Sequence, residues 1–382
     1  MKQSCCELWN QELKGHQIER VQFYRCRARY PRLHGKNAIR GYHGFGGEIE
    51  VAKLTTKDGI TGWGQLSRGM DEAKRNKELL LKRPLTELFD SGTGILDEKL
   101  LAFDIPLHDL AGKILGIPVC RMINPDSVLR APVYDGAIYM NDIIPEDAPF
   151  GVDRVIQESV ADVRLGHTIL KVKIGRGHRW MEHGEGMARD IEIVRRIHET
   201  LPGIAIMVDA NDGHTLEDAI AFLEGIGDTE IFWFEEPFRE EEGKNRLLKD
   251  YLLKERPGTL IADGESDTDI PLLRGLAEKK LLDVWQPDVC GYGFTKWRTL
   301  MKEISQNGWL ASPHAWGNVT KTHYCAHLAA AYPHHIPCVE AVLGSIEGVD
   351  FDGYCLERGT MKIPDKPGFG MDLIWAGEIT DS

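Results

Sequence analysis

Charged side chains recur at the carboxyl ends of short apolar segments in the second half of the chain. Seven segments each finish on a titratable residue, and from residue 209 onward the spacing is 26, 30, 23, 26 and 26 residues. In chain order these ends carry Lys171 and Lys173, Asp209 with Asn211, Glu235, Glu265, Asp288, His314 and Glu340. An acid at a strand end often only caps the next helix. Capping does not account for seven successive ends, so we interpret the set as one site.

Three carboxylates of this set indicate a metal site. Asp209, Glu235 and Glu265 follow three successive segments, and successive parallel strands lie side by side, so their carboxylates can converge. Carboxylate ligands with positions left for water or substrate suit Mg²⁺ better than zinc. The chain contains no HxH or HExxH pattern for a zinc site. A bound cation also explains an ionised Glu235 at the end of the apolar run IFWFEEPF (231–238).

Proton carriers flank the expected metal position. In an eight-membered ring of strands, Lys173 approaches the centre from one side, and His314 with Asp288 from the other. This arrangement predicts removal of the α-proton of a bound carboxylate through an enediolate. Lys171 and the cation would lower the pKa of Lys173, and Asp288 would fix the tautomer of His314. Glu340, if protonated, would donate a hydrogen bond to the intermediate.

Other interpretations stay open for three of these residues. Lys171 could simply pair with Glu235. His314 could be an ordinary hydrogen-bonded histidine. Asn211 could touch the water shell of the metal or cap the following helix.

The strands and helices that position these residues are predicted to form a barrel. Short apolar strands alternate with amphipathic helices, which predicts a parallel sheet covered by helices. The expected strands are 131–139, 170–174, 204–210, 231–237, 260–265, 283–288, 309–314 and 337–342. Eight units at this spacing favour a closed α/β barrel over an open doubly wound sheet, and no glycine-rich dinucleotide fingerprint opens the first unit.

The rest of the chain predicts a second domain. Strands are expected at 18–30 and 47–56, with a hairpin through Asp58-Gly59, and a helix at 97–116 that ends on Gly116. We expect an α+β domain over 1–128, the barrel over 129–345, and a tail over 346–382 that packs back on the first domain. The segment 41–47, GYHGFGG, lacks a P-loop lysine and is interpreted as a loop.

Composition excludes several classes of protein. A net charge of −13 over 382 residues argues against nucleic acid or an anionic membrane as the main partner. The polar start and the eight cysteines without CxxC spacing favour a cytoplasmic protein with reduced thiols. No apolar run is long enough to span a bilayer.

Seven ordered motifs resemble the enolase superfamily, specifically its mandelate racemase subgroup. They are LKVKIG at 170–175, VDAN at 208–211, FEEP at 234–237, DGE at 263–265, QPD at 286–288, SPH at 312–314 and VEA at 339–341. The resemblance implies an α/β fold, a (β/α)7β TIM-like barrel with an N-terminal α+β capping domain completed by the C-terminal tail. It also implies one Mg²⁺ per subunit, with Mn²⁺ as an alternative ion, and a homo-oligomer. The roles assigned above to Lys173, His314, Asp288 and Glu340 match those of the family.

Loops of the first domain suggest the substrate. The segment 30–47 carries Arg32, His34, Lys36, Arg40 and His43, and the loop after the second barrel strand adds Arg176. On an acidic chain this basic bias favours a polyhydroxylated acid. We assign these six residues, Asn211 and Trp316 to substrate binding.

Family membership leaves two reactions. A dehydratase would convert a sugar acid, an aldonate or aldarate, to a 2-keto-3-deoxy acid, and this is the reaction we expect. A racemase or epimerase of a 2-hydroxy acid is the alternative, and a barrel that binds an acid without catalysis is the third.

Overall fold

The computed structural model describes residues 5–144 and 151–374. Its first part is a capping domain built on an antiparallel sheet with strand order β14-β1-β2-β3. Here β1 spans Ile18–His34, β2 Gly44–Thr56 and β3 Thr61–Gln65. Gly59 adopts a φ of 90° in the predicted hairpin, a conformation that favours glycine. Helix α3 (Asp104–Leu115) packs on β3 and ends at Gly116 in the left-handed region, as expected.

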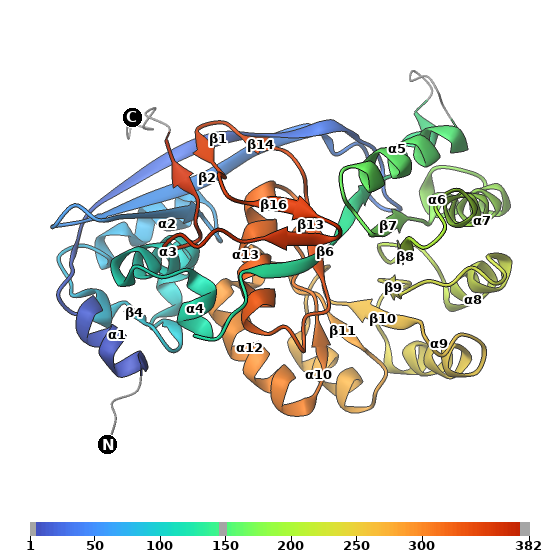
Figure 1. Ribbon diagram of the computed structural model, residues 1–382. Coiled ribbons are helices and arrows are strands. Elements are labelled where there is room, and N and C mark those ends of the chain that lie inside the picture. Colours follow the sequence, from blue (N-terminus) through green and yellow to red (C-terminus); the bar gives the residue numbers. More distant parts are fainter. Residues whose placement is uncertain (1–4, 145–150, 375–382) are drawn as a thin grey trace.

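Shorter elements complete the capping domain. The helices are α1 (Cys5–Leu13), α2 (Met70–Asn76) and α4 (Val119–Ile123), with 3₁₀ turns at Lys77–Leu79, Leu85–Glu87 and Glu98–Phe103 and small strands β4 (Phe89–Asp90) and β5 (Gly94–Ile95). Figure 1 shows β1 and β2 reaching from this domain across to the barrel near α5.

The second part is the predicted barrel of parallel strands. The strands are β6 (Arg130–Ile138), β7 (Ile169–Lys173), β8 (Ala205–Asp209), β9 (Trp233–Glu235), β10 (Leu260–Asp263), β11 (Val284–Trp285), β12 (Leu310–Ala311) and β13 (Val339–Ala341). Neighbours in the chain pair from β6 to β12, and β13 pairs in parallel with β6. The fold is therefore the expected α/β barrel under an α+β cap.

Helices follow the strands and cover the outside of the barrel (Figure 1). They are α5 (Val152–Arg164), α6 (Arg176–Arg179), α7 (His183–Thr200), α8 (Leu216–Gly225), α9 (Glu242–Glu255), α10 (Ile270–Glu278), α11 (Val289–Tyr292), α12 (Phe294–Asn307), α13 (Val319–Ala331) and a 3₁₀ turn at Asn141–Ile143. In the described ranges, no helix is both long and apolar enough to cross a bilayer.

A packed apolar layer fills the middle of the barrel. Six buried residues from different strands or strand starts contact one another there, namely Tyr134, Met207, Trp233, Ala262, Val284 and Cys338. Side chains that alternate inward along parallel strands produce such layers. This layer fills the barrel interior beneath the carboxyl ends of the strands, so the polar residues at those ends lie above an apolar core.

The C-terminal tail packs on both domains. Its strand β14 (Ser345–Ile346) extends the capping sheet beside β1, and Nε1 of Trp63 donates a 3.0 Å hydrogen bond to the Met371 carbonyl. Strand β17 (Thr360–Lys362) instead pairs with the start of β6 on the barrel, and β16 (Cys355–Glu357) pairs with β17. A further pair joins β15 (Val349–Asp350) to β18 (Asp372–Leu373). The predicted tail therefore joins the cap, as expected, and also closes over one side of the barrel. Its last residues, 375–382, lie outside the described ranges.

Candidate active site

Strand register places three of the predicted residues side by side. Lys173, Asp209 and Glu235 are the last residues of β7, β8 and β9, and Lys173 pairs with Asp209 and Asp209 with Glu235 in the parallel ladders. Glu265 follows β10 in the next unit. Because parallel strands end at one edge of the sheet, the four side chains gather at the mouth of the barrel.

The three predicted metal ligands converge. Asp209, Glu235 and Glu265 each offer a carboxylate oxygen, and these oxygens lie within 4.8 Å of one another. Among the described residues, Oε2 of Glu265 is buried without a hydrogen-bond partner, as is Oδ1 of Asn211. Burial raises the pKa of Glu235 to about 7, against the opposing effect of Lys171. Close carboxylates with an unpartnered oxygen fit a hard divalent cation such as Mg²⁺.

Two lysines of β7 reach into this carboxylate cluster. Nζ of Lys171 donates to Glu235 and lies 3.2 Å from Oε1 of Glu340 and 3.5 Å from Oδ2 of Asp209. Lys171 therefore pairs with Glu235, as one interpretation held, and also reaches past β6 to Glu340 on β13. Lys173 donates to Asp209.

The ion pair with Asp209 raises the pKa of Lys173. Burial lowers this pKa and Lys171 lowers it further, but the carboxylates of Asp209, Glu265 and Glu235 together outweigh both, so the pKa lies above its ordinary value. The pKa of Asp209 lies correspondingly below its usual range, since Lys173 and Lys171 outweigh the effect of burial. The expected fall in the pKa of Lys173 depends on a cation that engages Asp209, so it stays a prediction for the metal-loaded site.

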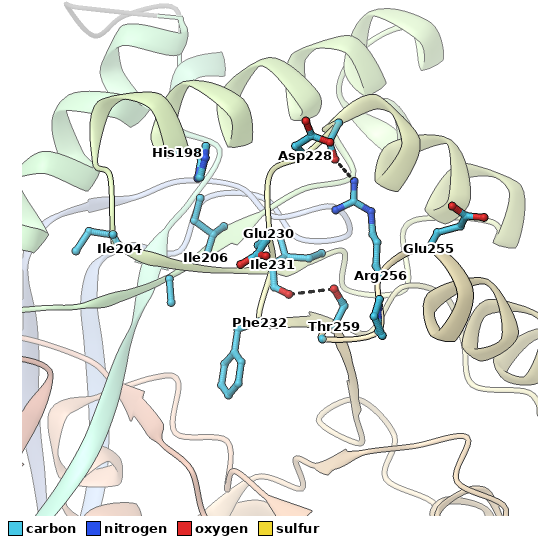
Figure 2. A pocket seen from close by; sticks show the side chains of 15 residues that line it. His198, Ile204, Ile206, Asp228, Glu230, Ile231, Phe232, Glu255, Arg256 and Thr259 are labelled. Atoms are coloured by element: carbon cyan, nitrogen blue, oxygen red, sulfur yellow. Dashed lines mark hydrogen bonds between the residues drawn. The ribbon is translucent and has the colours of Figure 1, made fainter.

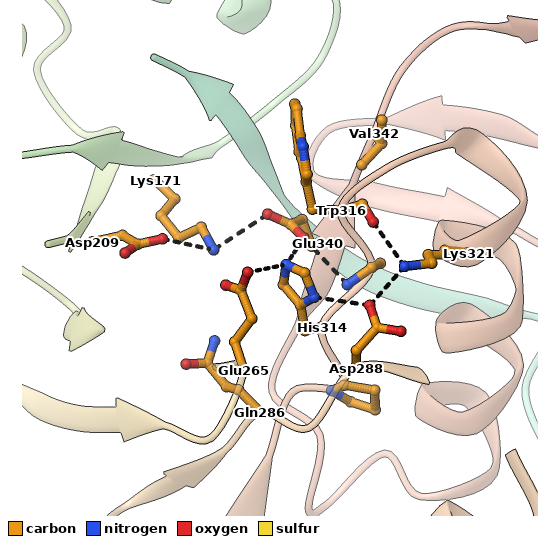
Figure 3. Close-up of polar contacts among 12 residues, drawn as sticks. Lys171, Asp209, Glu265, Gln286, Asp288, His314, Trp316, Lys321, Glu340 and Val342 are labelled. Atoms are coloured by element: carbon orange, nitrogen blue, oxygen red, sulfur yellow. Dashed lines mark hydrogen bonds and ion pairs between the residues drawn. The ribbon is translucent and has the colours of Figure 1, made fainter. Parts of the chain in front are cut away.

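The opposite side of the mouth carries the expected dyad (Figure 3). Nδ1 of His314 lies 3.0 Å from Oδ2 of Asp288, and Nε2 of His314 lies 3.2 Å from Oε1 of Glu265. Oδ1 of Asp288 accepts from the backbone N–H groups of Cys290 and Gly291. Because an ionised Asp288 only accepts hydrogen bonds, Nδ1 of His314 carries a proton and Nε2 faces the cluster.

Glu340 corrects one prediction. Burial raises its pKa, but Lys171 and His314 lower it by more, so the pKa lies below its ordinary value. Its Oε2 accepts a 3.2 Å hydrogen bond from the N–H of Ala315. Glu340 is therefore a carboxylate that links β7 to the loop after β12, and the prediction of a protonated acid is wrong here.

Asn211 does not cap the following helix. Thr215 caps α8 through a reciprocal bond with Asp218. Asn211 has a φ of 45° and Nδ2 lies 3.5 Å from Oε2 of Glu236, so its amide stays beside the carboxylate cluster. The capping interpretation is therefore excluded.

Two arginines predicted to bind substrate are engaged elsewhere. Arg176 is fully buried, where Nη2 lies 2.6 Å from Asp142 and Nη1 2.5 Å from Asp190. Arg32 pairs with Asp162 on α5 and donates a 3.2 Å bond to the Ala137 carbonyl. Buried arginines satisfied by carboxylates hold structure together. The assignment to substrate binding is therefore wrong for fully buried Arg176. Arg32 is partly exposed and its Nε has no hydrogen-bond partner among the described residues, so its assignment stays a prediction.

The remaining cap residues assigned to substrate binding differ in charge and in exposure. Burial, together with Arg32, lowers the pKa of His34 to about 3, and burial lowers the pKa of His43. Lys36 lies over the rings of Trp180 and Tyr42, 4.6 and 5.1 Å from their centroids. Arg40 is exposed. The two histidines of the expected basic lid are therefore neutral near pH 7, while Lys36 and Arg40 supply its positive charge.

Aromatic rings line the cap side of the mouth. Trp316 contacts Tyr139, His34, Tyr30 and His43, with ring centroids 4.8, 4.9, 5.5 and 6.1 Å away. We call these five residues the aromatic wall. They come from β1, the segment before β2, the segment after β6 and the loop after β12. Trp316 was assigned to substrate binding; it lies beside Glu340 and His314 (Figure 3), and that role stays a prediction.

A second loop contact joins the cap to the barrel. Nη1 of Arg179 donates to the Ile39 carbonyl, and Nε1 of Trp180 donates to the Asn37 carbonyl, both at 2.6 Å. The loop after β7 thereby holds the cap segment between β1 and β2 against the barrel.

Three nearby residues were not assigned from the sequence. Tyr139 follows β6, and its ring centroid lies 5.5 Å from Nζ of Lys173. Nε2 of Gln286 donates a 2.7 Å hydrogen bond to Glu235. Lys321 lies 2.7 Å from Asp288 (Figure 3). Gln286 belongs to the QPD motif at 286–288. Lys321 could have been recognised because a lysine in the first turn of a helix is unfavourable.

A large cavity lies at the other end of the barrel and is not part of this site. It has a volume of about 770 Å³ and lies where β8, β9 and β10 begin, beside Ile204, Phe232 and Thr259 (Figure 2). Arg256 at its rim donates to backbone carbonyls of Thr229 and Gly227. Active sites of such barrels lie at the carboxyl ends of the strands, so we place the chemistry at the mouth.

Comparisons with known proteins match the chain to one family. Residues 155–376 match the family model described as enolase C-terminal domain-like. A crystal structure of galacturonate dehydratase from Geobacillus sp., with D-galacturonate and 5-keto-4-deoxy-D-galacturonate, is 32% identical with a TM-score of 0.87 and covers 94% of this chain and 95% of its own. A mandelate racemase/muconate lactonizing protein from Geobacillus sp. Y412MC10, complexed with magnesium and tartrate, is 31% identical with a TM-score of 0.85, covering 94% and 93%.

A curated relative acts on another sugar acid derivative. D-galactarolactone cycloisomerase of Agrobacterium fabrum is 25% identical over 364 residues, which cover 85% of this chain and 88% of the relative. The family model and both solved structures indicate the same family. The chain belongs to the enolase superfamily, in its mandelate racemase/muconate lactonizing subgroup.

Proposed function

We propose that the protein dehydrates a sugar acid to a keto-deoxy acid in a Mg²⁺-dependent reaction, and that D-galacturonate is the first substrate to test. The observation that carries the proposal is the carboxylate cluster flanked by Lys173 and by the His314–Asp288 dyad. The similar galacturonate dehydratase supports the choice of acid. Its bound acid and keto-deoxy acid differ by one water molecule.

Asp209, Glu235 and Glu265 would hold the cation. When bound, Mg²⁺ supplies a positive charge that stabilises the enediolate form of the substrate carboxylate. It would also engage the carboxylate of Asp209, which now pairs with Lys173. Lys171 keeps a positive charge beside Glu235 and Glu340 and so helps to neutralise the site.

Lys173 and His314 carry the protons. Lys173 removes the α-proton, which leaves its electron pair in the enediolate. As the electron pair returns to form the α,β double bond, the β-hydroxyl leaves with a proton donated by His314, so that one water is released. The resulting enol tautomerises to the keto acid. Asp288 holds the proton of His314 at Nδ1 and leaves Nε2 for the transfer.

The aromatic wall would contact the distal part of the substrate. Tyr and Trp rings combine apolar faces with a polar edge, which suits a sugar with alternating C–H and O–H groups. Both ring nitrogens of His34 are buried and, among the described residues, without a hydrogen-bond partner. They can serve substrate hydroxyl groups. A neutral wall favours hydroxyls over a second carboxylate, so we favour monoacids over aldarates.

The experiment is a screen of the purified protein with MgCl₂ against D-galacturonate, aldonates and aldarates in deuterated water. We expect a keto-deoxy product from at least one monoacid, detected as its semicarbazone and by proton NMR. The matched negative control is the double variant Lys173→Ala/His314→Asn.

The other outcomes separate the alternatives. Deuterium at the α-carbon of recovered acid without keto product would indicate a racemase or epimerase. Conversion of a sugar lactone without loss of water would indicate a cycloisomerase. Tight binding of an acid without either signal would indicate a binding protein, although the presence of every proton carrier argues against it.

A further inference from the structure

Lys321 occupies an unusual position for a lysine. Asn318 caps α13, which places Lys321 in the first turn of that helix. The N-terminal turn of a helix favours negative charge and disfavours a cation. The side chain of Lys321 is only 13% exposed, whereas lysines are seldom buried unless they are paired. A local preference broken in this way is expected where a residue serves a site.

The partner of Lys321 is the carboxylate that orients His314. Nζ of Lys321 lies 2.7 Å from Oδ2 of Asp288, and Nδ1 of His314 lies 3.0 Å from that same oxygen (Figure 3). Nζ also donates a 2.9 Å hydrogen bond to the carbonyl of Trp316. Lys321 therefore joins the dyad to the loop that carries one ring of the aromatic wall.

The other oxygen of Asp288 is held by the backbone. The N–H groups of Cys290 and Gly291 donate to Oδ1 at 3.0 and 2.7 Å. These bonds fix one oxygen, but rotation about that anchor would still move the other. Lys321 supplies the remaining restraint on Oδ2, the oxygen that His314 uses.

We propose that Lys321 is a positioning residue for the reaction, which acts through Asp288 to hold the ring of His314 in the orientation needed for proton transfer. The inference rests on the proposed function. Without Lys321, the Asp288 carboxylate turns about its backbone anchor and the Nε2 atom of His314 loses its fixed place beside Glu265. Small misplacements of a proton carrier reduce turnover strongly.

A second lysine offers a matched control. Lys249 on α9 pairs with Asp283 at 2.6 and 2.7 Å, and the two side chains are 12% and 19% exposed. Lys321 and Asp288 are 13% and 20% exposed. The two ion pairs thus match in chemistry and burial, but the Lys249 pair does not contact the dyad. Lys249→Met measures the general cost of losing such a pair.

The first measurement needs no substrate. Proton NMR of the Mg²⁺-loaded protein should show the Nδ1–H of His314 as a downfield signal that is missing from His314→Asn. We expect this signal to shift or disappear in Lys321→Met, to persist in Lys321→Arg, and to stay unchanged in Lys249→Met. An unchanged signal in Lys321→Met would overturn the proposal, whether or not the protein dehydrates sugar acids.

The second measurement uses the acid identified in the substrate screen. We expect Lys321→Met to lower kcat about 10- to 100-fold with KM changed less than about 3-fold, and Lys321→Arg to recover part of kcat. In an Asp288→Asn background, Lys321→Met should lower kcat by less than about 3-fold, because residues that act through one another are not additive. A loss no larger than that of Lys249→Met, or one fully retained in the Asp288→Asn background, would refute the positioning role.

Discussion

Nε2 of His314 lies 3.2 Å from Oε1 of Glu265, so the proposed acid on one side of the mouth touches a candidate metal ligand. On the other side Lys173 touches Asp209, the ligand from the neighbouring strand of β7. The cation position is therefore bounded by both proton carriers. This arrangement suits chemistry at a carbon next to a bound carboxylate.

Single substitutions should separate the two proton carriers. We expect Lys173→Ala and His314→Asn each to lower kcat by at least about 1,000-fold, in line with the loss of a general acid or base. The melting temperature should stay within a few degrees of the wild-type value. Incubation in deuterated water should show which variant still exchanges the α-proton of the substrate. An active double variant would refute both assignments.

Arg176 should affect stability and not substrate affinity. Arg176→Met leaves Asp190 buried without its cation and leaves Asp142 with a 3.4 Å contact to Arg189, and we expect a loss of about 3–5 kcal/mol in the free energy of unfolding. Arg179→Met on the same helix removes a hydrogen bond and a contact with the Trp180 ring from an exposed side chain, and should cost about 1 kcal/mol. Chemical denaturation measures both. A stable Arg176→Met with a raised KM would restore the substrate-binding assignment.

Buried neutral histidines should make the protein sensitive to mild acid. Burial lowers the pKa of His323 from 6.5 to about 3. The unfolded chain therefore binds more protons below pH 6.5, so stability is full above that pH and is lost as the pH falls toward 3. At pH 5 the loss from this one group is about 2 kcal/mol. We expect the melting temperature of His323→Gln to fall less steeply between pH 7 and pH 5 than that of the wild type.

His334 provides the control because it is exposed. His334→Gln should keep the wild-type dependence of melting temperature on pH. Equal slopes for His323→Gln and His334→Gln would show that burial of His323 does not contribute to acid sensitivity.

A methyl group at Gly136 should lower activity by displacing Glu340. A Cβ atom there would lie 2.1 Å from Oε1 of Glu340, too close for any real contact. We expect Gly136→Ala to displace Glu340, to break its contact with Lys171 and to lower kcat at least about 10-fold. Gly275→Ala on α10 tests the opposite case, since no atom lies within 4 Å of its Cβ, and it should keep kcat near the wild-type value. Equal kcat values for the two variants would contradict the proposed role of Glu340.

The sequence predicted the strand-end residues well because their positions follow from chain order. Asp209, Glu235 and Glu265 end successive βα units, so a parallel barrel must bring them together. The same reasoning placed Lys173 opposite His314. Charge states were harder, since the pKa values of Lys173 and Glu340 depend on which partner lies nearest, and the ion pairs with Asp209 and Lys171 decide them.

Residues that depend on packing between elements could not be predicted. Arg176 reads as a free loop cation until Asp142 and Asp190 close around it. The aromatic wall contains Tyr30 from the cap and Trp316 from the end of the barrel. Tyr30 also donates a hydrogen bond to the carbonyl of Gly317, which is 287 residues away in the sequence. Contacts between residues so far apart cannot be predicted from local sequence patterns.

The most direct test of the central claim is a crystal structure of the protein grown with MnCl₂ and examined by anomalous scattering. We expect a single strong peak in the mouth of the barrel, within about 2.0–2.3 Å of carboxylate oxygens from Asp209, Glu235 and Glu265. A peak bound elsewhere, or none at saturating Mn²⁺, would contradict it.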